Sequence, residues 1–265
     1  MNNAGFRNFG ARFIDGPCAG MLDFFRDSAG SLKLFFLSAG NISRLRLHPV
    51  KTVFYRQIYF TGIDALSKIA VIGALIGVVI ITQITRFAGM DASLTGKALV
   101  WTDVKEIGPL FAAFIVIARS CGAVASELGS MRINREIDSL LVMGIDPVGY
   151  LIMPRIAGIT VSVFVLIFYF QVFSVIGGLA LAYLFAGVPF YKYLARTYEE
   201  LGFGDIGISL LKGLIFGLVI STVSCYQGFR IRGSAAEVPK ATTAAVMQSL
   251  FLVLIADTVI AITLQ

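Results

Sequence analysis

The chain has 265 residues, of which 57% are hydrophobic and only 14% are charged, and its formal net charge is +6. In a soluble domain, roughly a quarter of all residues are usually charged. The composition of this chain, with a mean hydropathy of +0.83, therefore excludes a soluble protein and indicates an integral membrane protein. The basic residues lie at the N-terminus and in short loops rather than along one face, which favours lipid headgroups over nucleic acid as their partner.

The N-terminal region predicts an amphipathic helix over residues 21–37. Its apolar stripe comprises Met21, Phe25, Ala29, Leu32 and Phe36. A Phe-rich face of this kind buries shallowly in the membrane interface, although an amphipathic helix packed on the bundle gives the same pattern. The first twenty residues have no continuous apolar core, so we expect no cleaved signal peptide. We assign residues 1–56 to this cytoplasmic and interfacial region and residues 57–265 to the membrane domain.

Five apolar segments are predicted to span the membrane, which makes the fold class an all-α integral membrane protein. They cover residues 69–85, 107–126, 156–185, 208–227 and 244–264. The third is long enough to tilt or to break near Gly177 and Gly178. Lys and Arg are far more numerous on the side of the N-terminus, so that side is predicted to be cytoplasmic. An odd number of spans then puts Gln265 outside.

The cytoplasmic loop between the second and third spans predicts a short helix over residues 135–143. Asn134 is placed to cap it, Gly144 can adopt the left-handed conformation that ends it, and Pro147 prevents its continuation. Its apolar positions are Ile137, Leu140 and Leu141. The helix either rests on its own bundle or docks a cytoplasmic partner.

Charged residues inside apolar spans are costly and need partners or water. Arg119 lies deep in the second span, where it either pairs with a carboxylate such as Asp257 or contacts a headgroup. Glu106 lies at the mouth of the same span, either as a charge at a helix start or as part of a polar gate. Lys212 is expected to reach the interface from the outer end of the fourth span.

Small-residue spacing in two spans permits close helix approach, at Gly73 and Gly77 and at Gly213 and Gly217. The cysteines are far apart, and no cluster of metal-ligand spacing occurs, so we expect neither disulfides nor a metal site. No GxxxxGK[ST] phosphate-binding loop occurs, so any ATP must be bound by another chain. Motifs of membrane hydrolases are also missing, which argues against an enzyme.

Three stretches carry a resemblance to a known family: KEIGP at 105–109, AR at 118–119, and GAVASELGSMRINREIDSLLVMGIDPVGYLIMPR at 122–155. They resemble the central signature of the MlaE/YrbE permeases, the membrane subunits of ABC-type lipid transporters that work with MCE proteins. The similarity extends over residues 53–264 and includes the glycines of the first span, Ala241-Thr242-Thr243 and Asp257.

The resemblance implies specific roles for individual residues. The loop helix would be a coupling helix to the ATPase, through Arg132, Arg135, Glu136, Asp138 and Leu141. A lipid cavity at a dimer interface would be lined by Ile80, Gln83 and Phe87. Lys105 and Glu106 would form the polar gate or contact the partner protein, and Arg119 and Asp257 would be the polar residues within the membrane.

The function implied is that of a permease subunit in the bacterial inner membrane, passing phospholipid between that membrane and a periplasmic MCE ring and so serving outer-membrane lipid asymmetry. The implied partners are a second copy of the chain, cytoplasmic ATPase subunits that bind ATP and Mg²⁺, and a small cytoplasmic accessory subunit. Nucleic acid is not among them. The residues alone leave an alternative open, a transporter driven by an ion gradient through Arg119 and Asp257.

Overall fold

The computed structural model describes residues 24, 26–38, 40, 48–88, 92–187, 189–231 and 234–264. This part of the chain is helical and contains no strand. Five helical stretches in it are long and apolar enough to cross a membrane: Pro49–Phe87, Leu94–Ile133, Val148–Phe185, Phe203–Phe229 and Glu237–Leu264. The predicted all-α membrane fold with five spans is therefore confirmed.

Several of these stretches are built from successive helical segments. The first comprises α2 (His48–Thr61), the 3₁₀ turn η2 (Ile63–Ala65) and α3 (Leu66–Ala88). The second comprises α4 (Ala92–Leu99), η3 (Val100–Ile107), α5 (Gly108–Val116), η4 (Ile117–Cys121) and α6 (Gly122–Ile133). After α7 (Glu136–Val142), the third comprises η5 (Val148–Ile152), α8 (Met153–Val172), η6 (Phe173–Gly177) and α9 (Gly178–Ala186). The remaining helices are α10 (Phe190–Glu200), α11 (Phe203–Phe229) and α12 (Glu237–Leu264). The predicted boundary between residues 56 and 57 falls inside α2.

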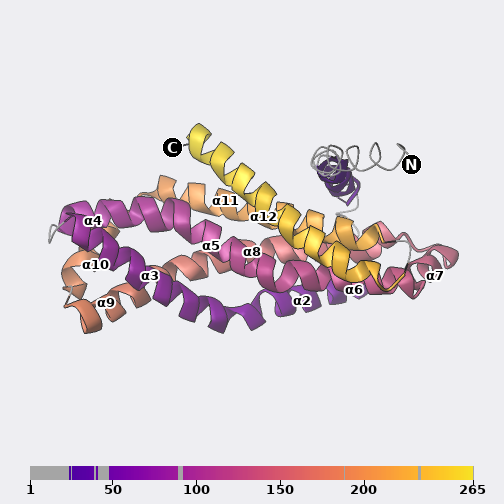
Figure 1. Cartoon of the computed structure of the whole chain (residues 1–265), viewed down its shortest axis with the longest axis horizontal. Helices are drawn as coiled ribbons and strands as arrows, with labels where there is room; N and C mark the ends of the chain where they lie inside the picture. The colour runs from indigo at the N-terminus through magenta and orange to yellow at the C-terminus, as the bar shows by residue number, and fades with distance from the viewer. Residues whose placement is uncertain are drawn as a thin grey trace, which may run out of the picture.

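The helices form an elongated bundle with α7 at one end and α4, α9 and α10 at the other (Figure 1). α8 lies at its centre and packs against α11, α2, α5 and α3. α12 packs on α11 and α6 and diverges from the bundle towards its C-terminus (Figure 1). Its apolar side chains there, such as Ile255, Val259 and Ile262, are exposed and suit contact with acyl chains.

The spans extend beyond the predicted limits at the end opposite α7. The stretch between Arg86 and Lys105 was expected to be a loop, but α4 and η3 continue the second span there. α10, which the sequence analysis did not predict, packs against α4. Its buried face follows a helical period through Tyr193 and Thr197. A small second core of Leu99, Leu179 and Tyr193 holds this end together.

Four π-helical segments interrupt the second and third spans. Each π-helical segment contains an extra residue relative to an α-helical turn, which changes the direction of the side chains that follow it. Such segments are frequent at functional sites. η6 ends at Gly177 and α9 begins at Gly178, so the helix type changes at the predicted position, but the third span continues without a break from Val148 to Phe185. η3 and η6 face each other, because Ser174 of η6 donates a hydrogen bond to Asp103 of η3 at 2.8 Å.

Two glycine pairs lie at close helix contacts, as predicted from their spacing. A Cβ atom at Gly77 would overlap the carbonyl oxygen of Ser174, and one at Gly217 would lie 2.8 Å from Cα of Thr160. The first span therefore meets η6 backbone to backbone, and α11 meets α8 in the same way. Close approach of this kind maximises van der Waals contact where lipid supplies no hydrophobic driving force.

Replacing Gly77 with alanine is expected to lower the free energy of unfolding by about 1–3 kcal/mol, because the backbones of α3 and η6 must move apart. The matched control is Gly207→Ala in α11, where an added Cβ meets no atom within 4 Å. That change is expected to be neutral or slightly stabilising, since alanine favours a helix. Thermal unfolding of both purified variants in detergent measures the difference. Equal stabilities would contradict the close contact.

The helix over residues 26–38 packs on the bundle by its polar face. Asp27 accepts hydrogen bonds from Arg230 and, at 3.3 Å, from Gln227, and Gln248 donates to Ser28 at 3.2 Å. The apolar side chains of Leu32 and Phe36 point outward and are exposed. Both predicted features thus occur together, a contact with the bundle and an outward apolar face. Met21 and Phe25 of the predicted stripe lie outside the described residues.

Candidate functional site

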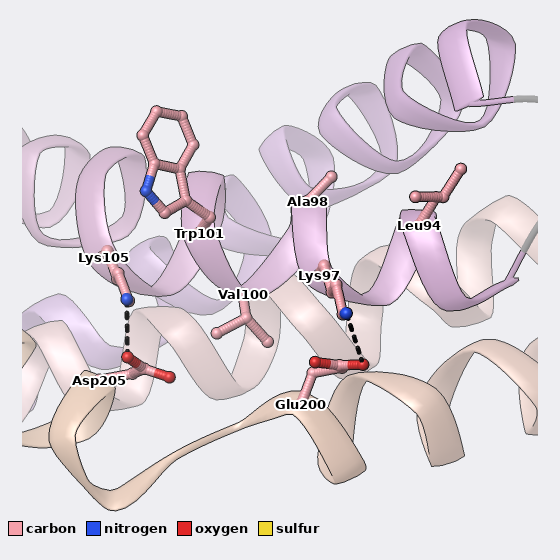
Figure 2. Close-up of a pocket in the computed structure, with 8 residues that line it drawn as sticks. All are labelled: Leu94, Lys97, Ala98, Val100, Trp101, Lys105, Glu200 and Asp205. Carbon is pink, nitrogen blue, oxygen red and sulfur yellow. Dashed lines mark ion pairs between the residues drawn. The ribbon is translucent and has the colours of Figure 1, made fainter.

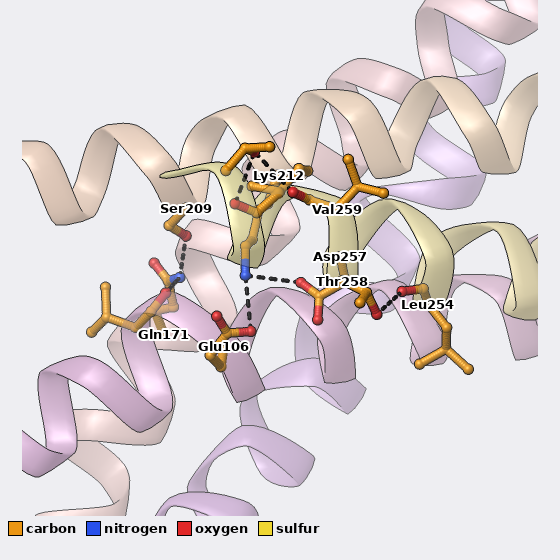
Figure 3. A network of polar contacts seen from close by, with 11 residues as sticks. Glu106, Gln171, Ser209, Lys212, Leu254, Asp257, Thr258 and Val259 are labelled. Atoms are coloured by element: carbon orange, nitrogen blue, oxygen red, sulfur yellow. Dashed lines mark hydrogen bonds and ion pairs between the residues drawn. The ribbon is translucent and has the colours of Figure 1, made fainter. Parts of the chain in front are cut away.

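The most highly charged buried site joins three spans through Lys212. Its side chain, on α11, is 0% exposed and lies 2.9 Å from Glu106 of η3 and 2.8 Å from Asp257 of α12 (Figure 3). The second oxygen of Glu106 is also buried and has no hydrogen-bond partner among the described residues. A buried ammonium group requires such counter-charges, because removal from water is costly. The cluster therefore fixes the second, fourth and fifth spans to one another.

A chain of neutral hydrogen bonds extends this cluster towards the third span. Gln171 of α8 donates to the backbone oxygen of Val104 at 3.0 Å and to the hydroxyl of Ser209, which lies one helical turn before Lys212 (Figure 3). Asp103 is buried beside Ser174, and one of its carboxyl oxygens has no hydrogen-bond partner in the part of the chain that the structure describes. All of these contacts involve the π-helical segment η3 or its neighbours. The polar residues are thus concentrated where the second span departs from α-helical geometry.

Lys105 points away from this cluster into an open pocket. It lies 2.7 Å from Asp205, and Lys97 lies 3.7 Å from Glu200, so two ion pairs connect α4 and η3 to α10 and α11 (Figure 2). The pocket has a volume of about 480 Å³, and the exposed Trp101 stands at its edge. Lys105 and Glu106, adjacent in sequence, therefore face different partners. Their predicted role as a gate or partner contact stays a prediction.

Two expectations about charged residues in the spans are wrong: the reach of Lys212 to the interface, and Asp257 as the suggested partner of Arg119. Lys212 does not extend outward to the interface, because its side chain is 0% exposed and is held between Glu106 and Asp257. Asp205 accepts a hydrogen bond from the N–H of Gly202 at 3.0 Å and starts the helix there. Asp257 pairs with Lys212 rather than with Arg119.

Arg119 forms an ion pair with Asp64 instead. Asp64 lies in η2, at the junction of α2 and α3, and is also 3.8 Å from Lys68. The guanidinium group of Arg119 lies 5.3 Å from the ring centroid of Phe60, within the range of a cation–π contact. The predicted pairing of Arg119 with a carboxylate is therefore confirmed, and this contact ties the first span to the second.

The loop after the second span forms the predicted short helix, α7. Gly144 has a φ of +74° and ends it, as predicted. Asn134 is not its N-cap, because Asn134 closes α6 and Arg135, with a φ of +57°, precedes the first helical residue. Asp146 then accepts hydrogen bonds from the N–H groups of residues 148 and 149, at 3.1 and 3.2 Å, and starts the third span.

α7 has one face on its own bundle and another that is exposed. Ile137 is buried, whereas Leu141, Val142 and Met143 are exposed, Val142 to 88%. Arg132 at the end of α6 lies 2.8 Å from Asp138 of α7, which connects the helix to the second span. The alternative in which the helix rests on its own bundle is confirmed through Ile137, whereas docking of a cytoplasmic partner stays a prediction. Exposed apolar side chains grouped in this way typically mark interaction sites.

The residues predicted to line a lipid cavity lie on successive turns of α3. Phe87 is 90% exposed and Gln83 is exposed, whereas Ile80 is buried in the second core. In this single chain they do not enclose one space. Their role at an interface with a second copy stays a prediction.

Sequence reasoning missed Asp103, Gln171 and Ser209 as members of the polar cluster. None of them is unusual alone, since single polar residues occur in many membrane helices. For Gln171 the depth was a usable signal, because this residue lies near the middle of the predicted third span and must find a partner there. The partner itself could not be identified, since it lies 67 residues away in sequence at Val104.

Comparison with known proteins places this arrangement in a family. A family model described as Permease MlaE matches residues 54–263. A probable ABC transporter permease protein of Rickettsia typhi is 30% identical over 238 residues, which cover 88% of this chain and 90% of that protein. The chloroplastic protein TRIGALACTOSYLDIACYLGLYCEROL 1 of Arabidopsis thaliana is 30% identical over 213 residues, 77% of this chain and 59% of that protein. A probable ABC transporter permease protein of Synechocystis is 26% identical and covers 76% of this chain.

The matched region covers nearly all of the five apolar helical stretches, and it includes the buried cluster around Lys212 and the short helix α7. The chain therefore belongs to the MlaE family of ABC transporter permeases.

Proposed function

We propose that this chain moves phospholipid, or a similar amphipathic lipid, between the bacterial inner membrane and a periplasmic MCE protein ring, driven by a separate ATPase. In this proposal two copies of the chain form a cavity for the lipid. The N-terminus and α7 face the cytoplasm, and the C-terminus faces the periplasm. ATP and Mg²⁺ belong to the ATPase subunits.

The exposed apolar end of α7 is the observation that carries this proposal. Leu141, Val142 and Met143 project from a helix that connects two spans directly. Glu127 of α6 and Arg155 of α8 lie 3.0 Å apart and brace the two span ends on either side of it. A partner that moves α7 as a rigid body would therefore move both spans together. We assign ATPase docking to Leu141 and Asp138, with Arg132, Arg135 and Glu136 around them.

The proposed lipid substrate is supported by the Arabidopsis relative, because that protein is named after a galactolipid, trigalactosyldiacylglycerol. It is also supported by the exposed apolar side chains along α3, which include Leu75, Val79 and Phe87. Pairing of two α3 helices across a dimer would enclose an apolar space suited to acyl chains. Lys105 and Glu106, at the end remote from α7, are placed to act as a gate beneath the MCE protein.

The experiment is to purify the tagged chain in mild detergent and to identify the proteins and lipids that accompany it by mass spectrometry. The proposal expects an ATPase subunit, an MCE protein and phospholipid. If crosslinking in intact membranes also found no ATPase, the docking role of α7 would be abandoned.

Lipid occupancy is expected to depend on Phe87. A Phe87→Glu variant should reduce co-purifying phospholipid at least ten-fold, because a carboxylate is strongly disfavoured beside acyl chains. The matched control is Phe185→Glu, since Phe185 is also a phenylalanine at the end of a span and is 81% exposed. Phosphorus analysis of the purified proteins measures both. Equal loss in the two variants would argue against a cavity at Phe87.

A further inference from the structure

A second polar pocket lies at the α7 end of the bundle, between the helix over residues 26–38, α6 and α11. Its volume is about 500 Å³. Three basic side chains line it, Lys33, Arg132 and Arg230, and none of the described residues lining it is acidic. The pocket therefore presents positive charge where three helices converge.

The carboxylates that pair with two of these cations lie outside the pocket. Asp138 contacts Nη1 of Arg132, and Asp27 contacts Nη1 of Arg230. A guanidinium group carries five N–H donors, so each arginine retains donors for a further oxygen ligand. Lys33 is exposed and adds a third cation. Together they suit a phosphate group, whose oxygens accept several charge-assisted hydrogen bonds.

The surroundings of the pocket are apolar, which distinguishes it from a site for a free anion. Tyr226, Phe229 and Leu37 contribute to its walls. Next to it the helix over residues 26–38 exposes Leu32, Phe36 and Leu37 in a continuous row. Phe229 is the last residue of α11, so the pocket lies where the apolar part of that span ends. A phosphate bound here would have room for acyl chains along that row.

We propose that this pocket binds the headgroup of an anionic phospholipid through Lys33, Arg132 and Arg230. Basic pockets between membrane helices bind such headgroups through charge. Arg132 gives the site a structural consequence, because the same side chain holds Asp138 of α7. A bound phosphate would share this guanidinium group with Asp138 and so connect the pocket to α7. The binding site itself requires neither a transported substrate nor an ATPase.

The test is native mass spectrometry of the purified full-length chain with phosphatidylglycerol or phosphatidylcholine carrying the same acyl chains. Wild type is expected to bind phosphatidylglycerol preferentially. Lys33→Ala should weaken that binding about five-fold, the typical contribution of one basic residue near an anionic headgroup, and should leave phosphatidylcholine unchanged. Lys51→Ala is the matched control, since Lys51 is an exposed lysine on α2 that does not line the pocket. Lys33 is exposed, so its loss should leave the thermal unfolding temperature unchanged.

Three outcomes would overturn the proposal. Wild type could bind both lipids equally, or Lys33→Ala and Lys51→Ala could bind phosphatidylglycerol with the same affinity. Displacement of the lipid by inorganic phosphate at a ten-fold molar excess would assign the pocket to a free anion instead. Because no ATPase is present in this assay, its failure is independent of the docking role proposed for α7.

Discussion

Replacing Lys212 with methionine is expected to lower the free energy of unfolding by about 3–5 kcal/mol, the typical cost of removing one partner from a buried ion pair. Methionine fills a similar volume, so the loss comes from charge. Glu106 and Asp257 would remain largely buried without a cation, and they would repel each other. Thermal or denaturant unfolding followed by fluorescence of Trp101, the one tryptophan in the chain, provides the measurement.

The control is Lys68→Met, because Lys68 is exposed and lies 3.8 Å from Asp64. An exposed pair of this kind contributes less than about 1 kcal/mol. Adding Glu106→Gln and Asp257→Asn to Lys212→Met should recover most of the lost stability, since neutral amides tolerate burial better than unpaired carboxylates. A Lys212→Met variant as stable as wild type would show that the cluster is not held together by charge.

Replacing Asp138 and Leu141 together with alanine is expected to reduce the stimulation of a partner ATPase at least ten-fold while leaving this chain folded. Leu141 is exposed, and Asp138 is a half-exposed member of an ion pair, so neither contributes much to the stability of the chain alone. Their loss would instead remove apolar contact and charge from the proposed docking surface. ATPase activity of the reconstituted complex, compared with that of the ATPase alone, measures the effect.

Two variants complete this experiment. Ile137→Ala changes the buried face of the same helix and should destabilise the chain by about 2–5 kcal/mol through loss of core packing. Leu184→Ala removes an exposed leucine at the opposite end of the bundle and should leave both stability and coupling unchanged. Normal ATPase stimulation in the Asp138 and Leu141 double variant would refute the docking role of α7.

The ion-driven alternative considered from the sequence depended on Arg119 and Asp257 acting together. The structure places them in separate clusters, with Arg119 beside Asp64 and Asp257 beside Lys212. Both clusters connect one span to another, which is a structural role. Membership of the ABC permease family agrees with this separation, because an ABC transporter takes its energy from a partner ATPase rather than from an ion gradient.

The span ends illustrate a limit of prediction from hydropathy. Apolar composition located the core of the fourth span at residues 208–227, but the helix begins at Phe203 because Asp205 caps it. Hydropathy also could not show that Lys212 is buried, because its partners Glu106 and Asp257 lie on other spans. Hydropathy missed α10 as well, because its mixed polar and apolar sequence is typical of a loop. Only its contact with α4 shows that it is a packed helix.

The sequence alone determined the number of spans, the short helix α7 and the close approach permitted at Gly77, because each depends on residues near one another in the chain. Hydrophobic length, helical period and the steric demands of glycine are local properties. The tertiary structure alone decided that Lys212 bridges Glu106 and Asp257, that Arg119 pairs with Asp64, and that Ile137 is buried while Leu141 is exposed. An intramembrane charge can be satisfied by any counter-charge at the same depth, and only the packing of distant helices selects which one it meets.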